Sequence, residues 1–419
     1  MKKLFFLLLI NCFCKVSFSQ EKIVSEVIVE GVKKTKPSFV KQYIQTKVHK
    51  VLDSLVLQQD INALRRLPAV TNANYITKAT KNNSYKVVIT IEENITIIPN
   101  VGFWTTTNNR FAYKLGVYDY NFLGRNITLG GFYQNNGFDT YAVNFKAPNL
   151  FSNKWGLAVN HQNWKSEEPL YFANGTANYL YNNIAVEFLG LYAINYKNNL
   201  RFGVNFFKEK YSYLSGLRSE AIPQYLNLNK TLFKLAYTCN DLAYHYQYVS
   251  GFKTDFYAQY VVSENDFQNS FIIAWNDFLF YRRIKKRGNW ANRLRVGLAT
   301  NNDSPFAPFA LDNNVNIRGI GILVDRGTGV AVLNSEYRYT LYDKKKIALQ
   351  SNLFLDAGSW RTPGGSLKDF TKSENIQVYS GIGLRLISKK IYNATFRIDY
   401  GVSLKDNTKG IVFGLGQYF

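Results

Sequence analysis

From about residue 99 onward, the chain alternates apolar and polar positions with a period of two. Runs of roughly 8–12 residues carry the alternation, and Asn, Gly, Asp, Lys and Ser separate the runs. In one run, a single face holds Leu200, Phe202, Val204 and Phe206. Because successive side chains of a strand point to opposite sides, this pattern predicts many antiparallel strands, each with one apolar face.

Two architectures explain such a pattern. In a transmembrane β-barrel the apolar faces meet lipid and the polar faces line the lumen, whereas in a soluble sandwich the apolar faces meet each other. The length of the stretch 98–419 allows about 20 residues per strand and connection if there are about sixteen strands. About fourteen or eighteen strands also fit this length.

The residues before position 98 follow another pattern, with apolar residues at helical spacing between short strand-like runs. The order β-α-α-β-β predicts a small α+β domain over 20–97, followed by the β-rich domain over 98–419. We expect, in chain order, a strand at Ile23–Val29, a helix that Thr35 caps and that runs to about Gln45, a helix at Ser54–Leu67, and strands at Ala69–Lys78 and Tyr85–Glu92.

Residues 1–19 have the features of a secretory signal peptide. Two lysines precede the apolar stretch Leu4–Cys14, and Ser17 and Ser19 are small residues before a cleavage point ahead of Gln20. We therefore expect the mature chain to be exported.

The charge and the cysteine content limit the partners of such an exported chain. The full sequence has a formal net charge of +22, and removal of the three lysines of residues 1–19 leaves 22 − 3 = +19. This charge suits anionic lipid head groups, acidic glycans or acidic polypeptides, and we expect no nucleic-acid partner. A plainer explanation is that the charge keeps the loops solvated. Only Cys239 remains after removal of the signal, so we expect no internal disulfide.

Motifs for catalysis and metal binding are absent from the sequence. The three histidines, His49, His161 and His245, are scattered along the chain. There is no cysteine–histidine cluster, nucleophile elbow or phosphate-binding loop. We therefore expect no metal, no cofactor and no enzymatic activity.

The last residues of the chain form a distinctive strand. Phe413, Leu415 and Phe419 share one face by alternation, and Gly416 lies among them. A barrel pairs its last strand with its first, since an open edge in lipid leaves backbone groups unsatisfied. The segment resembles the carboxyl-terminal β-signal of bacterial outer-membrane proteins, with Phe419 at the membrane interface.

Five short motifs follow one another along the chain. They are Val29-Glu30-Gly31 with Thr35, Phe122-Leu123-Gly124-Arg125, Ile317-Arg318-Gly319-Ile320, Glu336-Tyr337-Arg338 and Phe354-Leu355-Asp356-Ala357-Gly358. In this order they resemble motifs of the BamA/TamA-type outer-membrane assembly superfamily, whose members join POTRA domains to a surface-antigen barrel. Ile320 stands where that family has an aromatic residue, and the chain has room for one POTRA domain.

The resemblance implies an all-β transmembrane barrel of about sixteen antiparallel strands in the outer membrane, preceded by one POTRA domain in the periplasm. It also implies a role in inserting or translocating polypeptides. The partners would be extended outer-membrane polypeptides and the bilayer with its anionic lipid head groups. The alternative is a passive outer-membrane channel or a structural surface protein without assembly activity.

A clamp between a lumen loop and the barrel wall is a further implication of the resemblance. In this clamp Arg318, next to Gly319, binds Glu336 and Asp356. The alternation agrees, because both acids fall on the polar faces of their strands, toward the lumen. One guanidinium carries five donors and bonds two carboxylates at once. The alternative is an exposed Arg318 and two ordinary lumen charges.

Overall fold

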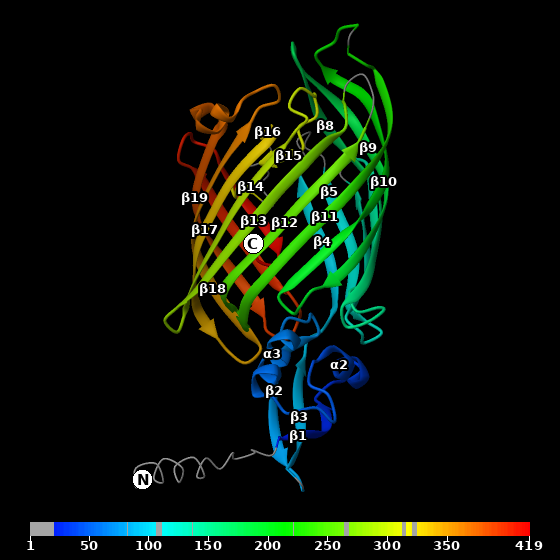
Figure 1. Ribbon diagram of the computed structural model, residues 1–419. Helices are drawn as coiled ribbons and strands as arrows, with labels where there is room; N and C mark the ends of the chain where they lie inside the picture. The colour runs from blue at the N-terminus through cyan, green and yellow to red at the C-terminus, as the bar shows by residue number, and fades with distance from the viewer. Residues whose placement is uncertain are drawn as a thin grey trace, which may run out of the picture.

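The computed structural model describes residues 21–81, 83–105, 111–135, 137–220, 222–263, 268–311, 316–320 and 325–419. The signal peptide expected at 1–19 lies outside these residues. Figure 1 shows a small domain at one end of a tall β-rich domain. Among the described residues, no helix is both long enough and apolar enough to cross a membrane.

The small domain has the predicted element order β-α-α-β-β. Strand β3 (Ser84–Glu93) lies in the middle of its sheet, parallel to β1 (Ile23–Glu30) and antiparallel to β2 (Val70–Ala79). Two helices, α2 (Pro37–Tyr43) and α3 (Ser54–Leu64), complete the domain. One core holds it together, to which the five elements contribute Val27, Val40, Ile61, Ala73 and Ile89, among others.

Both helices are shorter than predicted, and the cap expected at Thr35 is wrong. Lys36 occupies the N-cap position of α2, without a capping side chain, and Pro37 begins the helix. Thr35 is used elsewhere, in a contact with the barrel. Helix α3 ends at Leu64 rather than at residue 67, and Arg65, just past that end, donates from Nε to the carbonyl of Ala73 at 3.0 Å.

The β-rich domain is one antiparallel sheet of sixteen strands, so the predicted strand number is confirmed. Its strands are β4 (Ile97–Thr105), β5 (Phe111–Phe122), β6 (Ile127–Asn135), β7 (Asp139–Ala147), β8 (Trp155–Phe172), β9 (Gly175–Ala193), β10 (Asn198–Gly216), β11 (Tyr225–His245), β12 (Tyr248–Val262), β13 (Phe271–Ile284), β14 (Gly288–Ala299), β17 (Gly329–Asp343), β18 (Ile347–Arg361), β19 (Ile376–Ser388), β20 (Thr395–Ser403) and β21 (Lys409–Leu415).

Three short elements lie outside this sheet. Strands β15 (Phe309–Leu311) and β16 (Asp325–Gly327) pair with each other in the connection between β14 and β17. The 3₁₀ helices η1 (Leu367–Thr371) and η2 (Ser373–Asn375) connect β18 to β19. The long connection before β17 is the segment that carries Arg318.

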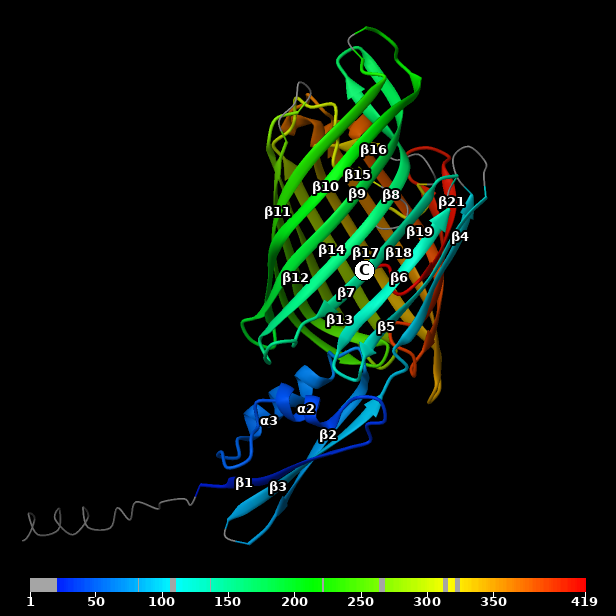
Figure 2. The ribbon, with the colours of Figure 1, turned by 90° about the vertical axis from the view of Figure 1, so that its right-hand side faces the viewer.

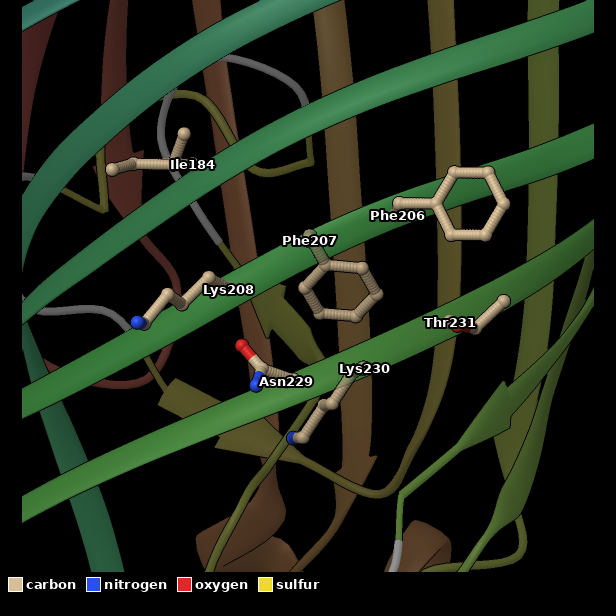
Figure 3. Close-up of a pocket in the computed structure, with 7 residues that line it drawn as sticks. All are labelled: Ile184, Phe206, Phe207, Lys208, Asn229, Lys230 and Thr231. Atoms are coloured by element: carbon tan, nitrogen blue, oxygen red, sulfur yellow. The ribbon is translucent and has the colours of Figure 1, made fainter.

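The two faces of the sheet differ as the alternation predicts. On β10, Phe202 and Phe206 are exposed, whereas Glu209 is buried on the inner face. Figure 3 shows this region of the wall, with Phe206 and Phe207 adjacent on β10 and Lys230 on β11. Inner polar residues are buried across the sheet while the outer face stays apolar, which is the arrangement of a barrel in lipid and not of a sandwich.

The two edges of the sheet are β4 and β21. Figure 2 shows the sheet curled into a barrel-like wall, with the labels of these two strands close together. A closed barrel would have a ladder of backbone hydrogen bonds between β4 and β21. No such ladder is found among the described residues, in which β4 extends to Thr105. Strand β21 has only seven residues, so it offers few backbone groups to a partner.

The small domain is bonded to the turn between β5 and β6. The amide of Lys36 donates to the carbonyl of Gly124 at 3.0 Å, and Asn121 Nδ2 donates to Thr35 Oγ1 at 2.9 Å. Gly124 has a φ of +68°, and a Cβ there would lie 2.1 Å from the carbonyl oxygen of Lys34. The motif that contains Gly124 is therefore the docking turn for the small domain.

Glu93 organises the chain segment that docks on this turn. Its carboxylate accepts the backbone N–H groups of Lys33, Lys34 and Thr35 at 2.9, 3.0 and 2.7 Å. Burial alone would raise the pKa of Glu93, but hydrogen bonds from Thr35 and from these amides outweigh it and lower the pKa below its ordinary value. The charged form of Glu93 therefore stabilises the docked segment.

We expect Glu93→Gln to destabilise the small domain by about 1 kcal/mol at neutral pH, since a half-exposed site weakens charged hydrogen bonds. A lowered folded-state pKa gives stability that is present above the unfolded pKa and is lost as pH falls through the folded pKa. Calorimetry of the full mature chain in detergent should therefore show a difference from wild type at pH 7 that shrinks toward pH 3. Glu30→Gln, at an exposed carboxylate on β1, is the control, and equal melting of E93Q and wild type at pH 7 contradicts this role.

Candidate functional site

The connection between β14 and β17 folds back against the inner wall of the barrel. Ile317 and Ile320 are buried there and pack with Val332, Trp360 and others of the same apolar cluster. Gly319 has a φ of +93°, and a Cβ on it would lie 2.8 Å from the backbone of Gly401 on β20. Because neither Gly319 nor Gly401 has a side chain, the backbone of the loop can lie directly against the backbone of β20.

Arg318 binds both acids that the sequence singled out. Its Nε and Nη2 donate to the two oxygens of Asp356 at 2.8 and 2.9 Å, and its own amide donates to Asp356 Oδ2 at 3.0 Å. Its Nη1 donates to Glu336 Oε2. All three side chains are fully buried, so the exposed arrangement of Arg318 does not occur.

The charge network around Arg318 is larger than the sequence predicted. Arg338 donates from Nε to Glu336, and Arg385 donates from Nη2 to Asp399 Oδ1 at 2.8 Å. Asp399 Oδ1 also lies 3.7 Å from Nη1 of Arg318. These three arginines and their three carboxylates, Glu336, Asp356 and Asp399, are all buried, and we call the six residues the lumen network.

Part of the lumen network was readable from the sequence. Arg338 lies two positions after Glu336, so alternation places both side chains on the inner face of β17. Arg385 on β19 and Asp399 on β20 belong to no motif. Only the pairing of these strands brings them beside the motif residues.

Two aromatic rings contact the guanidinium of Arg318. The ring of Phe354 lies 3.8 Å from its Cζ and that of Tyr418 lies 4.4 Å from it. Phe354 comes from β18, two positions before Asp356, so one strand supplies both a carboxylate and a ring. A cation between aromatic faces in a dry site gains further attraction.

Tyr418 reaches the lumen because the chain turns inward after β21. Gly416 has a φ of +84°, and its amide donates to the carbonyl of Thr395 at 2.8 Å. Tyr418 also lies 4.8 Å from the Cζ of Arg397, and the carbonyl of Phe419 accepts from Nη2 of Arg338 at 3.2 Å. We call residues 416–419 the inward segment.

The expectation that Phe419 shares the outer face with Phe413 and Leu415 is wrong. Phe413 and Leu415 do lie on the outer face, 72% and 44% exposed. Phe419 instead packs inside against the cluster that contains Leu242 and Leu279. The positive φ at Gly416 ends the strand alternation, so residue parity no longer determines where Phe419 points.

A second contact anchors the same loop on another part of the wall. Lys230 and Glu209 form a buried ion pair of 2.7 Å on β11 and β10. Lys230 also lies 5.7 Å from the ring of Phe306, and Gln268 donates to Ser304 at 3.3 Å. Because Phe306 and Ser304 precede Arg318 in this connection, the loop is held at two places.

The small domain has two outer strand edges, β1 and β2. On β1, backbone hydrogen bonds with residues 49–52 cover the first residues, among them Val24 N–H to the carbonyl of Lys50 at 2.9 Å. On β2, Arg65 covers the carbonyl of Ala73. Beyond Ala73, the outer backbone groups of β2 have no partner among the described residues. This edge is available to an extended peptide.

A cavity of about 770 Å³ lies where the small domain meets the barrel mouth. Tyr43, Arg66 and Pro68 line it from the small domain, and barrel turns line the other side. Arg66 spans the two parts, since its guanidinium donates to the carbonyls of Tyr196 and Leu242 at 2.9 and 3.2 Å. The cavity is therefore framed by both domains.

Comparisons with known proteins agree with this architecture. Residues 22–94 match the family model described as POTRA, surface antigen variable number repeat. No curated protein matches the chain.

Three solved structures share its fold. CdiB from Escherichia coli is 12% identical with a TM-score of 0.63, covering 94% of this chain and 73% of that one. CdiB from Acinetobacter baumannii is 12% identical with a TM-score of 0.61, covering 95% and 74%. BamA from Haemophilus ducreyi lacking POTRA domains 1–3 is 14% identical with a TM-score of 0.55, covering 94% and 83%.

We expect Arg318→Ala to leave the protein exported but to destabilise the barrel by about 3–5 kcal/mol, because buried Asp356 loses its arginine and buried Glu336 loses one of its arginine partners. The folded band in semi-native gel electrophoresis should then disappear at a lower temperature. Arg326→Ala is the matched control, since it removes a half-exposed ion pair with Glu168 from the same connection. Melting of R318A together with wild type would show that the fold does not depend on Arg318.

Tyr418→Leu should lower barrel stability by about 1–2 kcal/mol, because it removes a ring from buried guanidinium groups. Tyr418→Phe keeps the ring and should stay closer to wild type. The same gel assay compares the two variants. If the leucine and phenylalanine variants melt alike, the ring face of Tyr418 makes no net contribution.

Proposed function

We propose that this chain, which joins a POTRA domain to a barrel with the fold of BamA and CdiB, helps to insert or translocate polypeptides at the bacterial outer membrane. Its barrel lies in the outer membrane and its POTRA domain in the periplasm. The work is non-enzymatic and needs no cofactor. The single observation that carries this proposal is the uncovered edge of β2 beside the barrel mouth.

The edge of β2 suits an extended client. An added strand pairs through main-chain hydrogen bonds, which do not depend on the client's sequence. Docking of the small domain through Asn121 and Gly124 holds this edge in a defined place below the wall. A client segment paired on β2 is therefore delivered to one side of the barrel mouth.

The unpaired edges β4 and β21 support the next step. A strand edge offers unsatisfied N–H and C=O groups, which a client strand satisfies by pairing. Since the described residues contain no ladder between the two edges, few bonds have to break before a client enters. The seam between β4 and β21 is thus the lateral exit of the proposed pathway.

The lumen network supports the pathway from inside. The loop that carries Arg318 bonds to β17 and β18, and the inward segment rests on the same arginine. The seam strand β21 is therefore coupled to the loop through Tyr418. In this role the bonds of Arg318 hold the loop against the wall while β4 and β21 separate to admit a client.

Client binding is tested by placing a photocrosslinking amino acid at Ile76, which is 53% exposed on β2. We expect crosslinks to extended outer-membrane polypeptides in cells. The same probe at Lys86 on the central strand β3 is the control and should give few. A passive channel, the alternative, predicts ion conductance and no client crosslinks at either position.

A further inference from the structure

Three neighbouring hairpins at one end of the barrel carry a dense row of cations. They connect β13 to β14, β17 to β18, and β19 to β20, and Figure 1 shows the first two turns at the end near the small domain. Their cations are Arg282, Arg283, Lys285, Lys286, Arg287, Lys344, Lys345, Lys346, Lys389 and Lys390.

Most of these cations are not neutralised. Lys389 pairs with Asp343, and Lys390 pairs with Glu92 of the small domain. The other eight are exposed, and none makes an ion pair with an acid in the described part of the chain. We call these eight residues, 282, 283, 285–287 and 344–346, the cationic row. Such unpaired charge on a fixed surface attracts an anionic partner.

The hairpins are bonded to one another, so the cationic row has a fixed shape. The amide of Thr340 donates to the carbonyl of Arg287 at 2.8 Å, and that of Lys389 donates to the carbonyl of Lys346 at 2.9 Å. The amide of Ile95 then donates to the carbonyl of Lys390 at 2.9 Å. These bonds tie all three turns to the link between the domains.

The outer face of the wall next to the cationic row has two further bands. Trp290 and Tyr337 are directly opposite each other on β14 and β17, close to the turns, and both are exposed. Farther from the turns, Leu294 and Leu333 form the next apolar pair. Leucine, then aromatic rings, then cations is the order in which a bilayer presents hydrocarbon, interface and head groups.

We propose that the cationic row binds the phosphate groups of anionic phospholipids in the leaflet that faces the POTRA domain. This inference rests on the outer-membrane placement in the proposed function. An acidic polypeptide could also pair with the cationic row. It would not explain why the same strands carry a band of aromatic residues and a band of leucines next to the row. Because β17 and β18 also carry Glu336 and Asp356, the lipid contact fixes the wall that holds the lumen network.

The test uses the full mature chain in phosphatidylcholine bilayers that contain spin-labelled phosphatidylglycerol or spin-labelled phosphatidylcholine. Electron paramagnetic resonance gives the share of each lipid held at the protein surface. We expect wild type to prefer phosphatidylglycerol by roughly fivefold or more, and the preference to fall at high salt. K344Q/K345Q/K346Q and K285Q/K286Q/R287Q should each lower it.

The matched control is K50Q/K78Q/K81Q, which removes three exposed cations from the small domain and should leave the preference unchanged. Semi-native gels check that each variant is folded. Equal selection of the two lipids by wild type, or an unchanged preference in both hairpin variants, overturns the inference. Polyglutamate binding by the same variants tests the acidic polypeptide as a partner. If the hairpin variants lose polyglutamate binding but keep the lipid preference, the inference is also overturned. A chain that fails to enter bilayers defeats the proposed function itself.

Discussion

The buried pairing of arginines with carboxylates in the lumen is the constraint on which the rest of the barrel interior depends. A charge removed from water is tolerated only where a partner of opposite sign and further hydrogen bonds replace the solvent. Arg318 therefore determines where its loop lies, because Asp356 is held by two guanidinium nitrogens and by the amide of Arg318. The facing glycines, Gly319 and Gly401, allow the close approach that these bonds require.

The same network connects parts of the molecule that lie far apart in the sequence. Strands β17 to β20 supply its wall residues, the loop supplies Arg318, and the inward segment adds Tyr418 after the last strand. The docked POTRA domain lies at the barrel mouth, where Lys36 bonds to Gly124. The C-terminal strand β21 is connected to the lumen network through Tyr418, so a displacement of this strand would change the surroundings of Arg318.

Alternation explains how much of this was predictable. Period-two parity placed Glu336 and Asp356 in the lumen, and the length of the chain led to about sixteen strands, as found. Parity fails where the chain leaves the sheet, as Phe419 does after Gly416. Local propensity also fails at Thr35, where a contact with Asn121 replaces helix capping. Arg385 and Asp399 were missed because only strand pairing brings them to the motif residues.

A double-mutant cycle between Arg318 and Asp356 tests most directly whether the buried pairing holds the loop to the wall. R318A, D356A and the double variant would be compared with wild type for free energy of unfolding in urea. The account predicts a coupling of about 1–3 kcal/mol, so that the double variant is clearly less destabilised than the sum of the two single variants. Additive losses would contradict it, because they would mean that the two side chains stabilise the barrel independently.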